Sequence, residues 1–515
     1  MRNNSQISIL ICILLLGVFS AFTYWIGINH GKILFNENQI NRTSNVDVVI
    51  DNLLTNYVDS LDPNNFAEKA INNILKDLDP HSSYIPARER QRVNESLVGH
   101  FGGIGIRFMI YRDTLTIVDI ISGGPSESAG LEIRDRIVKI NSENIAGNGL
   151  ENEDVLKKLK GKVGTKVKLS VLKPNKQIVE KNIYRGSIPL KSISAYTILE
   201  NNIGYIKLSS FANSSDLEFK NAIYSLKKQG MESLIFDLRF NGGGYLHQAI
   251  NIADEFLSKD RLIVYTEGAH SKKRTFYSSS NGLFEKGKLV ILVNSSTASA
   301  SEIVSGAIQD NKRGTILGRR TFGKGLVQQP IMLPDSSELR ITTSRYYTPS
   351  GKCIQKPYGK DINYHNDIFE RIESGELTQN DSLNDNSIFK GGIIPDLYSP
   401  IDTLNYSEAI NNTIYTGNWR DFCFDYFERN PVQNFTNIKD FNDNFKVDLS
   451  LINSYLKENG KNIDQFNNQE LVDLEWSVKV ELSSYYYSDQ SRYILNTYKD
   501  NDVKRAIKEI INQSL

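Results

Sequence analysis

Apolar segments that alternate with amphipathic ones constrain the fold of this chain more than any other feature. Residues 203–211, 233–239, 288–294 and 314–318 are short and largely apolar, and a helical pattern of apolar side chains follows each of the first three. Strands that are apolar along their whole length are typical of parallel sheets, which helices cover. The pattern therefore predicts an α/β layer in this part of the chain.

A different pattern precedes this layer. Alternating segments at residues 114–121 and 166–173 are separated by turns rich in glycine and serine. Several short strands with one helix in about 90 residues predict a small, partly open β-barrel. Residues 360–392, after the strands of the α/β layer, are polar and rich in Asn and Asp, which indicates an irregular insertion.

Helical patterns flank these two regions. The N-terminal one ends in the connector LDPHSSYIP, and the C-terminal one is rich in aromatic residues without visible chemistry. We therefore expect a membrane or signal segment, a helical lead-in, the barrel, the α/β layer and a helical C-terminal part, at residues 1–30, 40–90, 91–185, 186–400 and 401–515.

Residues 7–28 form an apolar run that is long enough to cross a hydrocarbon core of about 30 Å as a helix. Arg2 precedes the run, and Tyr24 and Trp25 lie near its far end, which favours a single-pass inner-membrane anchor with a cytoplasmic N-terminus. The alternative is a cleaved signal peptide. Under both interpretations residues 29 onward are exported. We therefore expect the protein on the periplasmic side of the inner membrane, or in an equivalent compartment outside the cytoplasm.

Composition excludes several classes of function. The 515 residues include 60 basic and 60 acidic side chains, so the formal net charge is zero, and no dense basic block indicates nucleic-acid binding. The three cysteines form no Cys-x-x-Cys pair, and the six histidines form no ligand pattern. We therefore expect no metal, no other cofactor and no nucleic-acid partner.

Three segments that follow predicted strands carry candidate chemistry. DLRFNGGG at 237–244 offers backbone N–H groups that could hold an oxyanion, and NSSTASASEIVSGA at 294–307 offers serines at a helix start. RRTFGKGLVQQP at 319–330 places Lys324 between two glycines, and a buried lysine beside a serine can act as a general base. Each segment taken alone also fits a plain role, as a tight turn, a helix cap or a solvated loop.

Six motifs in order identify a resemblance that no single one would carry. LDPHSSY, FGGIGI, AGLEIRDRI, DLRFNGGG, TASASE and FGKGLVQ occur in this sequence at sensible spacings. The chain resembles the carboxy-terminal processing peptidases, or tail-specific proteases, from about residue 45 to about residue 400. The resemblance implies a multidomain α+β and α/β protein, with a PDZ-type barrel inserted before a crotonase/ClpP-like serine-protease core and helical parts at both ends.

The resemblance also implies a catalytic site. The nucleophile of the family matches Ser299, the general base matches Lys324, and an assisting glutamine matches Gln328. The oxyanion hole is expected from the N–H of Ala300 and of a glycine in the 237–244 loop. Either Gly243 or Gly244 could supply that second N–H.

A PDZ domain binds a peptide C-terminus as an added strand, beside a glycine-rich loop. The matching loop residues here are Gly102, Gly103, Ile104, Gly105 and Ile106. A plain barrel hairpin is the structural alternative for this loop. The implied function is an exported serine endopeptidase that cleaves near the apolar C-terminal tails of envelope proteins, with a possible adaptor or homo-oligomer as partner.

The sequence departs from the family pattern at three places. Ser296 and Gly242 replace a usual glycine and a frequent proline, and Arg134-Asp135 replaces a common Gly-Asp turn. The main alternative is a catalytically silent PDZ scaffold in the cell envelope. An acyl-transfer enzyme for small thioesters is a second alternative, and envelope binding through the C-terminal helices could coexist with proteolysis.

Overall fold

The computed structural model describes residues 45–359, 362, 364, 366–377, 391–401, 407–431 and 435–512. The chain forms two compact units, Met1–Ile74 and Leu75–Leu515. The anchor expected at residues 7–28 lies outside the described residues. In the ranges that are described, no helix is long and apolar enough to cross a membrane.

The described part of the first unit is helical. It contains α2 (Asn45–Asn56) and most of α3 (Pro63–Lys76). None of the described side chains before Leu75 is buried within the structure.

A six-stranded sheet forms the centre of the second unit. In spatial order it contains β10 (Ile193–Ile198), β11 (Ile203–Leu208), β12 (Ser233–Asp237), β15 (Leu289–Val293), β16 (Thr315–Gly318) and β19 (Leu397–Tyr398). The strands from β11 to β19 are parallel, and only the edge strand β10 runs antiparallel to its neighbour. Residues along β15 are all buried, because the sheet is covered on both faces.

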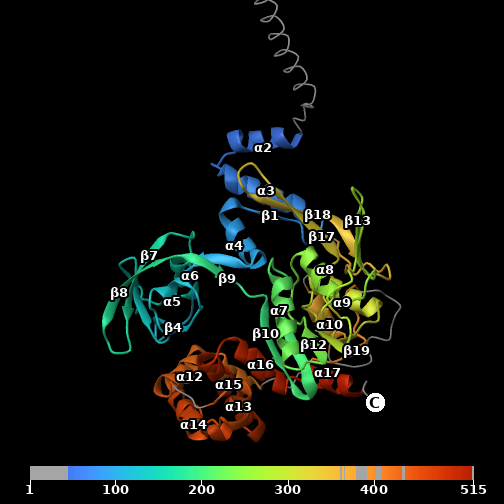
Figure 1. Cartoon of the computed structure of the whole chain (residues 1–515). Coiled ribbons are helices and arrows are strands. Elements are labelled where there is room, and N and C mark those ends of the chain that lie inside the picture. The colour runs from blue at the N-terminus through green and yellow to red at the C-terminus, as the bar shows by residue number, and fades with distance from the viewer. Residues whose placement is uncertain are drawn as a thin grey trace, which may run out of the picture. The chain divides into compact units, whose positions relative to one another are not determined.

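Helices α7 (Ser215–Lys228), α8 (Leu246–Asp254) and α9 (Ala300–Asp310) pack on one face of this sheet (Figure 1). Phe219, Phe236 and Phe256 meet between α7 and the sheet, with ring centroids 5.1 to 5.7 Å apart. The carboxyl ends of parallel strands lie along one edge of a sheet. The loops that follow β12, β15 and β16 therefore emerge together.

A second, antiparallel sheet supports those loops. It contains β1 (Ser83–Ile85), β18 (Glu338–Tyr347), β13 (Leu262–Gly268) and β14 (Ser271–Tyr277), and β17 (Leu326–Met332) pairs with β18. Part of the insertion expected at 360–392 forms α10 (Asp367–Glu373).

The barrel is a sheet of five strands in one path, with a short sixth strand. The strands are β3 (Ile106–Tyr111), β4 (Thr114–Ile120), β5 (Arg136–Ile140), β7 (Lys166–Leu172) and β8 (Ile178–Tyr184), with β6 (Glu143–Asn144) beside β5. Helices α5 (Pro125–Ser128) and α6 (Asn152–Leu159) complete it. Helix α4 (Ala87–Val98) leads into β2 (His100–Gly103), which pairs with β9 (Gly186–Pro189) where the chain leaves the barrel.

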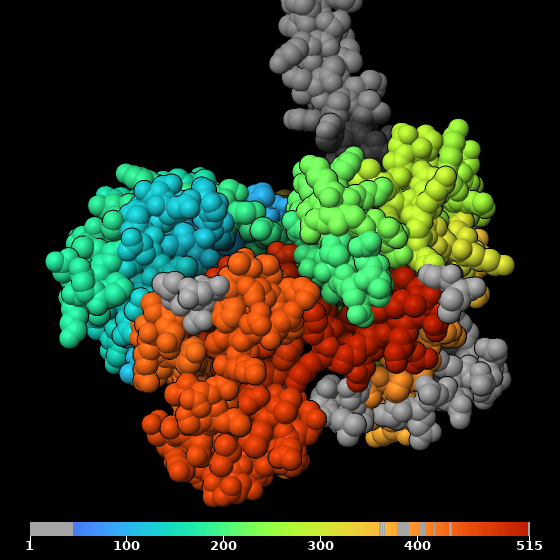
Figure 2. Space-filling model, turned by 60° about the horizontal axis from the view of Figure 1, so that its bottom comes forward, coloured from blue at the N-terminus to red at the C-terminus, as the bar shows by residue number. Residues whose placement is uncertain are grey.

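The C-terminal part is a set of helices: α11 (Glu408–Ile414), α12 (Gly417–Arg429), α13 (Ile438–Asn444), α14 (Leu449–Glu458), α15 (Asn468–Tyr486), α16 (Gln490–Lys499) and α17 (Asn501–Asn512). Side chains of α12 and α15 share an apolar cluster with Tyr111 and Val118 of the barrel. Val503, Ala506 and Ile510 pack on the face of the central sheet that α7, α8 and α9 leave open. Figure 2 shows the orange helices beside the cyan barrel and the red ones beside the green part of the central layer. The C-terminal helices therefore belong to the core of the second unit.

Candidate active site

Asn241 joins the glycine loop after β12 to the serine loop after β15. Its side-chain oxygen accepts the N–H of Gly243 at 2.9 Å, and its side-chain nitrogen donates to the carbonyl of Leu208 at 3.0 Å. Its main-chain carbonyl accepts the N–H of Ala298 and the hydroxyl of Ser301, both at 3.0 Å. Both loops are therefore fixed against each other through one residue.

The structure distinguishes the two glycines that are candidates for the oxyanion hole. Gly243 has a φ of +101°, and a Cβ there would lie 2.8 Å from Ser299 Cβ and 3.0 Å from the nitrogen of Ala300. Only glycine allows this close approach. The N–H of Gly243 is already bound to Asn241, whereas the described residues supply no acceptor for the N–H of Gly244. Of the two N–H groups, that of Gly244 therefore remains available to a bound oxyanion.

Ser299 stands at the N-terminus of α9 in an unusual backbone conformation. Its φ and ψ are 57° and −117°, a region that costs a non-glycine residue about 1–3 kcal/mol and that occurs mainly at functional sites. Ala300 is the first residue of the helix, and its N–H has no acceptor among the described residues. Ser299 thus lies beside a free N–H at the positive end of a helix dipole.

A buried carboxylate ties the Ser299 segment to the Lys324 segment. One oxygen of Glu302 accepts the N–H of Ser299 at 2.8 Å and that of Lys324 at 2.9 Å. The other accepts the N–H of Gly323 at 2.7 Å and the hydroxyl of Thr321. Burial raises the pKa of Glu302 to about 7, although these four hydrogen bonds act in the opposite direction.

Tyr346 makes a second connection between the same segments. The single hydrogen of its hydroxyl is shared between the main-chain carbonyl of Ser299, at 3.0 Å, and that of Lys324. Tyr346 is 1% exposed, so these bonds are shielded from solvent. Burial raises the pKa of Tyr346 well above its usual value, which keeps the hydroxyl protonated as a donor.

Lys324 has the environment that a lysine base requires. Its side chain is half-buried, and its Nζ donates to Oε1 of Gln328 at 3.4 Å. Burial lowers the pKa of Lys324, and the nearby positive charge of Arg340 lowers it further, while Asp79 and Glu302 act in the opposite direction. The neutral amine, which can accept a proton, is therefore more accessible than in an exposed lysine.

The connector LDPHSSY positions Gln328. The side-chain nitrogen of Gln328 donates to the main-chain carbonyl of His81. The carboxylate of Asp79 accepts the N–H groups of His81 and Ser82, both at 2.8 Å, and the hydroxyl of Ser82 at 2.6 Å. Sequence reasoning assigned no site role to these residues or to Glu302, Asn241 and Tyr346. The sequence did hold a signal for Asp79, His81 and Ser82, because an Asp side chain often accepts the main-chain N–H two residues further on in a turn.

The catalytic candidates share one groove of about 1310 Å³. Its lining includes Ser299, Ala300, Lys324, Gln328, Gly243 and Gly244. Gly102 of the predicted tail-binding loop also lines this groove, whereas Ile104 is 2% exposed and packs in the barrel core. Within the described ranges, no three His, Cys, Asp or Glu side chains gather where they could hold a metal ion.

Comparison with known proteins assigns both regions to families. Residues 202–364 match Peptidase family S41, and residues 116–173 match the PDZ domain. A carboxy-terminal-processing protease of Bartonella bacilliformis is 35% identical over 315 residues, which cover 60% of this chain and 71% of that protein. The carboxy-terminal processing protease CtpA of Bacillus subtilis is 32% identical over 303 residues, or 59% of this chain and 64% of that protein.

Among solved structures, the photosystem II D1 C-terminal processing protease is similar over 68% of this chain and 85% of its own, with 24% identity and a TM-score of 0.38. The predicted fold class, a PDZ-type barrel before an α/β protease core with a helical C-terminal part, is confirmed. The family resemblance carried by the six motifs is confirmed as well. The chain belongs to the carboxy-terminal processing proteases of peptidase family S41.

Proposed function

We propose that this chain is an exported serine endopeptidase that cleaves near the C-terminal tails of envelope proteins, with Ser299 as nucleophile and Lys324 as general base. The observation that carries the proposal is the placement of Lys324. Its amine has a lowered pKa, and its segment is joined to that of Ser299 by Glu302 and by Tyr346. A neutral lysine beside a serine is a known arrangement for activating a hydroxyl.

In the proposed mechanism, neutral Lys324 takes the proton of the Ser299 hydroxyl as its oxygen attacks the peptide carbonyl. The N–H groups of Ala300 and Gly244 stabilise the oxyanion that forms. Lys324 then gives its proton to the leaving amine, and the C–N bond breaks. A water molecule, deprotonated by the same lysine, attacks the acyl carbonyl; the bond from Ser299 Oγ to the acyl carbon breaks, and the lysine returns the proton to Oγ. Gln328 holds the amine of Lys324 in place throughout.

Tail binding is proposed for the PDZ domain. Strand β3 is at the edge of its sheet and pairs only with β4 in the described part of the chain. An edge strand can accept an extended peptide through main-chain hydrogen bonds, whose form does not depend on the side chains of the peptide. The loop from Gly102 to Ile106 immediately precedes this strand and is the proposed site for the terminal carboxylate.

The assignment can be tested with purified protein and a peptide that ends in an apolar tail. Ser299→Ala and Lys324→Ala should each lower kcat by roughly 10² or more. Lys352, which is exposed, provides the matched control, and Lys352→Ala should cleave like the wild type. A Ser299→Ala protein with wild-type activity would sink the nucleophile assignment. A wild type that binds tails but neither cleaves them nor reacts with an active-site serine reagent would favour a silent scaffold.

Export of the chain through residues 7–28 stays a prediction of the sequence. The mass of the protein purified from membranes distinguishes a retained anchor from a cleaved signal. A retained anchor leaves the N-terminal residues on the chain, and a cleaved signal removes them.

A further inference from the structure

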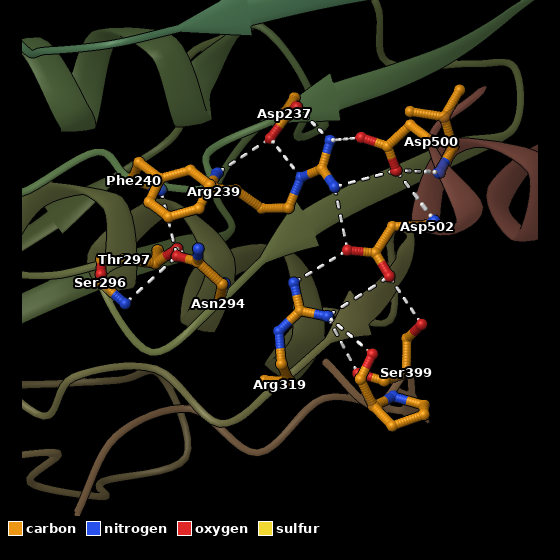
Figure 3. Close-up of polar contacts among 12 residues, drawn as sticks. Asp237, Arg239, Phe240, Asn294, Ser296, Thr297, Arg319, Ser399, Asp500 and Asp502 are labelled. Carbon is orange, nitrogen blue, oxygen red and sulfur yellow. Dashed lines mark hydrogen bonds and ion pairs between the residues drawn. The ribbon is translucent and has the colours of Figure 1, made fainter. Parts of the chain in front are cut away.

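Asp502 of α17 contacts Arg239 and Arg319, and Asp500, which lies between α16 and α17, contacts Arg239 (Figure 3). Oδ2 of Asp502 accepts Nη1 of Arg239 and Nη2 of Arg319, both at 2.9 Å. The two side-chain oxygens of Asp500 accept Nη1 and Nη2 of the same Arg239 guanidinium, at 3.0 and 2.7 Å. A single carboxylate of α17 therefore bridges two arginines that are 80 positions apart in the sequence.

Each arginine begins one catalytic segment. Arg239 is bonded to Asp237 at the end of β12 and directly precedes the loop of Asn241, Gly243 and Gly244. Arg319 directly follows β16 and begins the segment that leads to Lys324. Asp502 thus connects the start of the oxyanion loop to the start of the segment that carries the base.

The cluster is electrically balanced only when the C-terminal aspartates are present. Its cations are Lys207, Arg239 and Arg319, and its anions are Asp237, Asp500 and Asp502. The side chains of Arg239 and Arg319 are each 10% exposed, and that of Asp237 is 0% exposed. Without the two C-terminal aspartates, one anion would face two buried arginines and the half-buried Lys207, an arrangement that desolvation strongly disfavours.

Hydrogen bonds of Asn294 connect the position of Arg239 to the positions of the proposed reacting groups. The N–H of Phe240, next to Arg239, donates to the side-chain oxygen of Asn294 at 3.0 Å. The same oxygen accepts the N–H of Ser296 at 3.2 Å, three residues before Ser299. A shift of Arg239 would therefore move both the glycine loop and the turn that presents the nucleophile.

We propose that Asp502, assisted by Asp500, is a positioning residue for peptide hydrolysis, so that the C-terminal helices are part of the catalytic architecture. Asp502 holds Arg239 and Arg319 in place, and this fixes the positions of the oxyanion loop and of the Lys324 segment relative to Ser299. The inference rests on the proposed Ser299–Lys324 chemistry and adds a contribution from outside the matched protease region at 202–364.

The experiment compares Asp502→Asn, Asp502→Glu and the matched control Asp473→Asn in the full chain. Asp473 also joins two C-terminal helices, through an ion pair of 3.2 Å with Lys499, but it does not contact the arginine cluster. The measurements are kcat and KM on a tailed peptide, the rate of labelling by an active-site serine reagent, and the melting temperature.

At a temperature well below its melting point, Asp502→Asn should lower kcat by at least roughly tenfold and slow serine labelling, with KM within about twofold of the wild type. Asp502→Glu, which keeps the charge, should recover part of kcat, and Asp473→Asn should match the wild type. If Asp502→Asn does not fold, Asp500→Asn decides instead, because Asp500 is 24% exposed and its loss should lower kcat in the same direction.

Wild-type kcat and labelling in a folded Asp502→Asn protein would overturn the proposal. An equal loss in Asp473→Asn would do the same, since it would show a general effect on stability. Failure of the proposed function would give a different result, because the wild type itself would neither cleave the peptide nor react with the serine reagent.

Discussion

The hydroxyl of Tyr346 lies 3.0 Å from the main-chain carbonyl of Ser299 and donates a hydrogen bond to it. The same hydroxyl donates to the carbonyl of Lys324, so one buried phenol sets the spacing between the proposed nucleophile and the segment of the proposed base. Glu302 makes the equivalent connection through the N–H groups of the same two residues. The dyad is therefore held by its backbone from both sides.

Tyr346→Phe removes this donor and leaves the ring in place. We expect the free energy of unfolding to fall by about 1–3 kcal/mol, because the buried carbonyl of Lys324 loses this donor, whereas that of Ser299 keeps the N–H groups of Glu302 and Ile303. We expect kcat to fall roughly tenfold, because the spacing is no longer fixed. Urea unfolding and steady-state kinetics provide the measurements. Tyr347→Phe is the control, since Tyr347 packs through its ring against Tyr265, and an equal loss there would contradict the special role of Tyr346.

Glu302→Gln should abolish most activity although it preserves the shape of the side chain. All four partners of Glu302 donate hydrogen bonds, and an amide nitrogen would face two of them with its own hydrogens. We expect kcat to fall by roughly 10² and the protein to lose about 3 kcal/mol of stability at neutral pH. Glu267→Gln, at an exposed position, should behave like the wild type.

The pKa of Glu302 makes a further prediction for the stability of the wild type. The folded-state pKa of about 7 is above the ordinary value of 4.5, so the folded state binds the proton more tightly than the unfolded state. The contribution of Glu302 to the free energy of unfolding should therefore decrease as pH rises from about 4.5 to about 7. Urea unfolding across this range should show the decrease in the wild type and not in Glu302→Gln. The same slope in both proteins would rule out Glu302 as its source.

Arg340→Gln tests the source of the lowered pKa of Lys324. Removing this positive charge should raise the pKa of Lys324. Because the neutral amine is the proposed base, activity is lost as pH falls through that pKa. The acid limb of the kcat/KM profile should therefore move to higher pH in Arg340→Gln. Arg345→Gln removes a charge from the exposed side of the same strand and should leave the limb unmoved; a shift in both variants would indicate a long-range effect of net charge.

Gly243→Ala should block the site by a collision. The added methyl group would lie 2.8 Å from Ser299 Cβ and 2.9 Å from the carbonyl oxygen of Ala298, both in fixed segments. Serine labelling should become undetectable and kcat should fall by roughly 10² or more. Gly147→Ala is the control, because Gly147 also has a positive φ, +74°, but is surrounded by open space. Normal labelling in Gly243→Ala would show that the loop does not approach Ser299 as closely as the structure has it.

Local patterns in the sequence were sufficient for the α/β layer and the barrel, and the family resemblance that six short motifs carry indicated the candidate dyad. Continuous apolar strands and helical periodicity depend on neighbours within one element, so they can be read without the fold. The motifs around Ser299 and Lys324 are also local, and the ends of adjacent parallel strands bring such motifs together. The proposal of Gly244 over Gly243 as oxyanion donor, by contrast, depended on a hydrogen bond of Asn241 that no sequence spacing reveals.

The amino-acid sequence by itself thus determined the α/β layer, the barrel and the candidate residues Ser299, Lys324 and Gln328. Only the tertiary structure showed the contacts around them and their segments: the carbonyl of His81 at Gln328, the hydroxyl of Tyr346 between the segments of Ser299 and Lys324, and Asp502 between two arginines. Gln328 and His81 are 247 positions apart, and Arg239 and Asp502 are 263 apart. Such contacts are formed by side chains that become neighbours only when separate layers pack, so they cannot be predicted from the spacing of residues in the sequence.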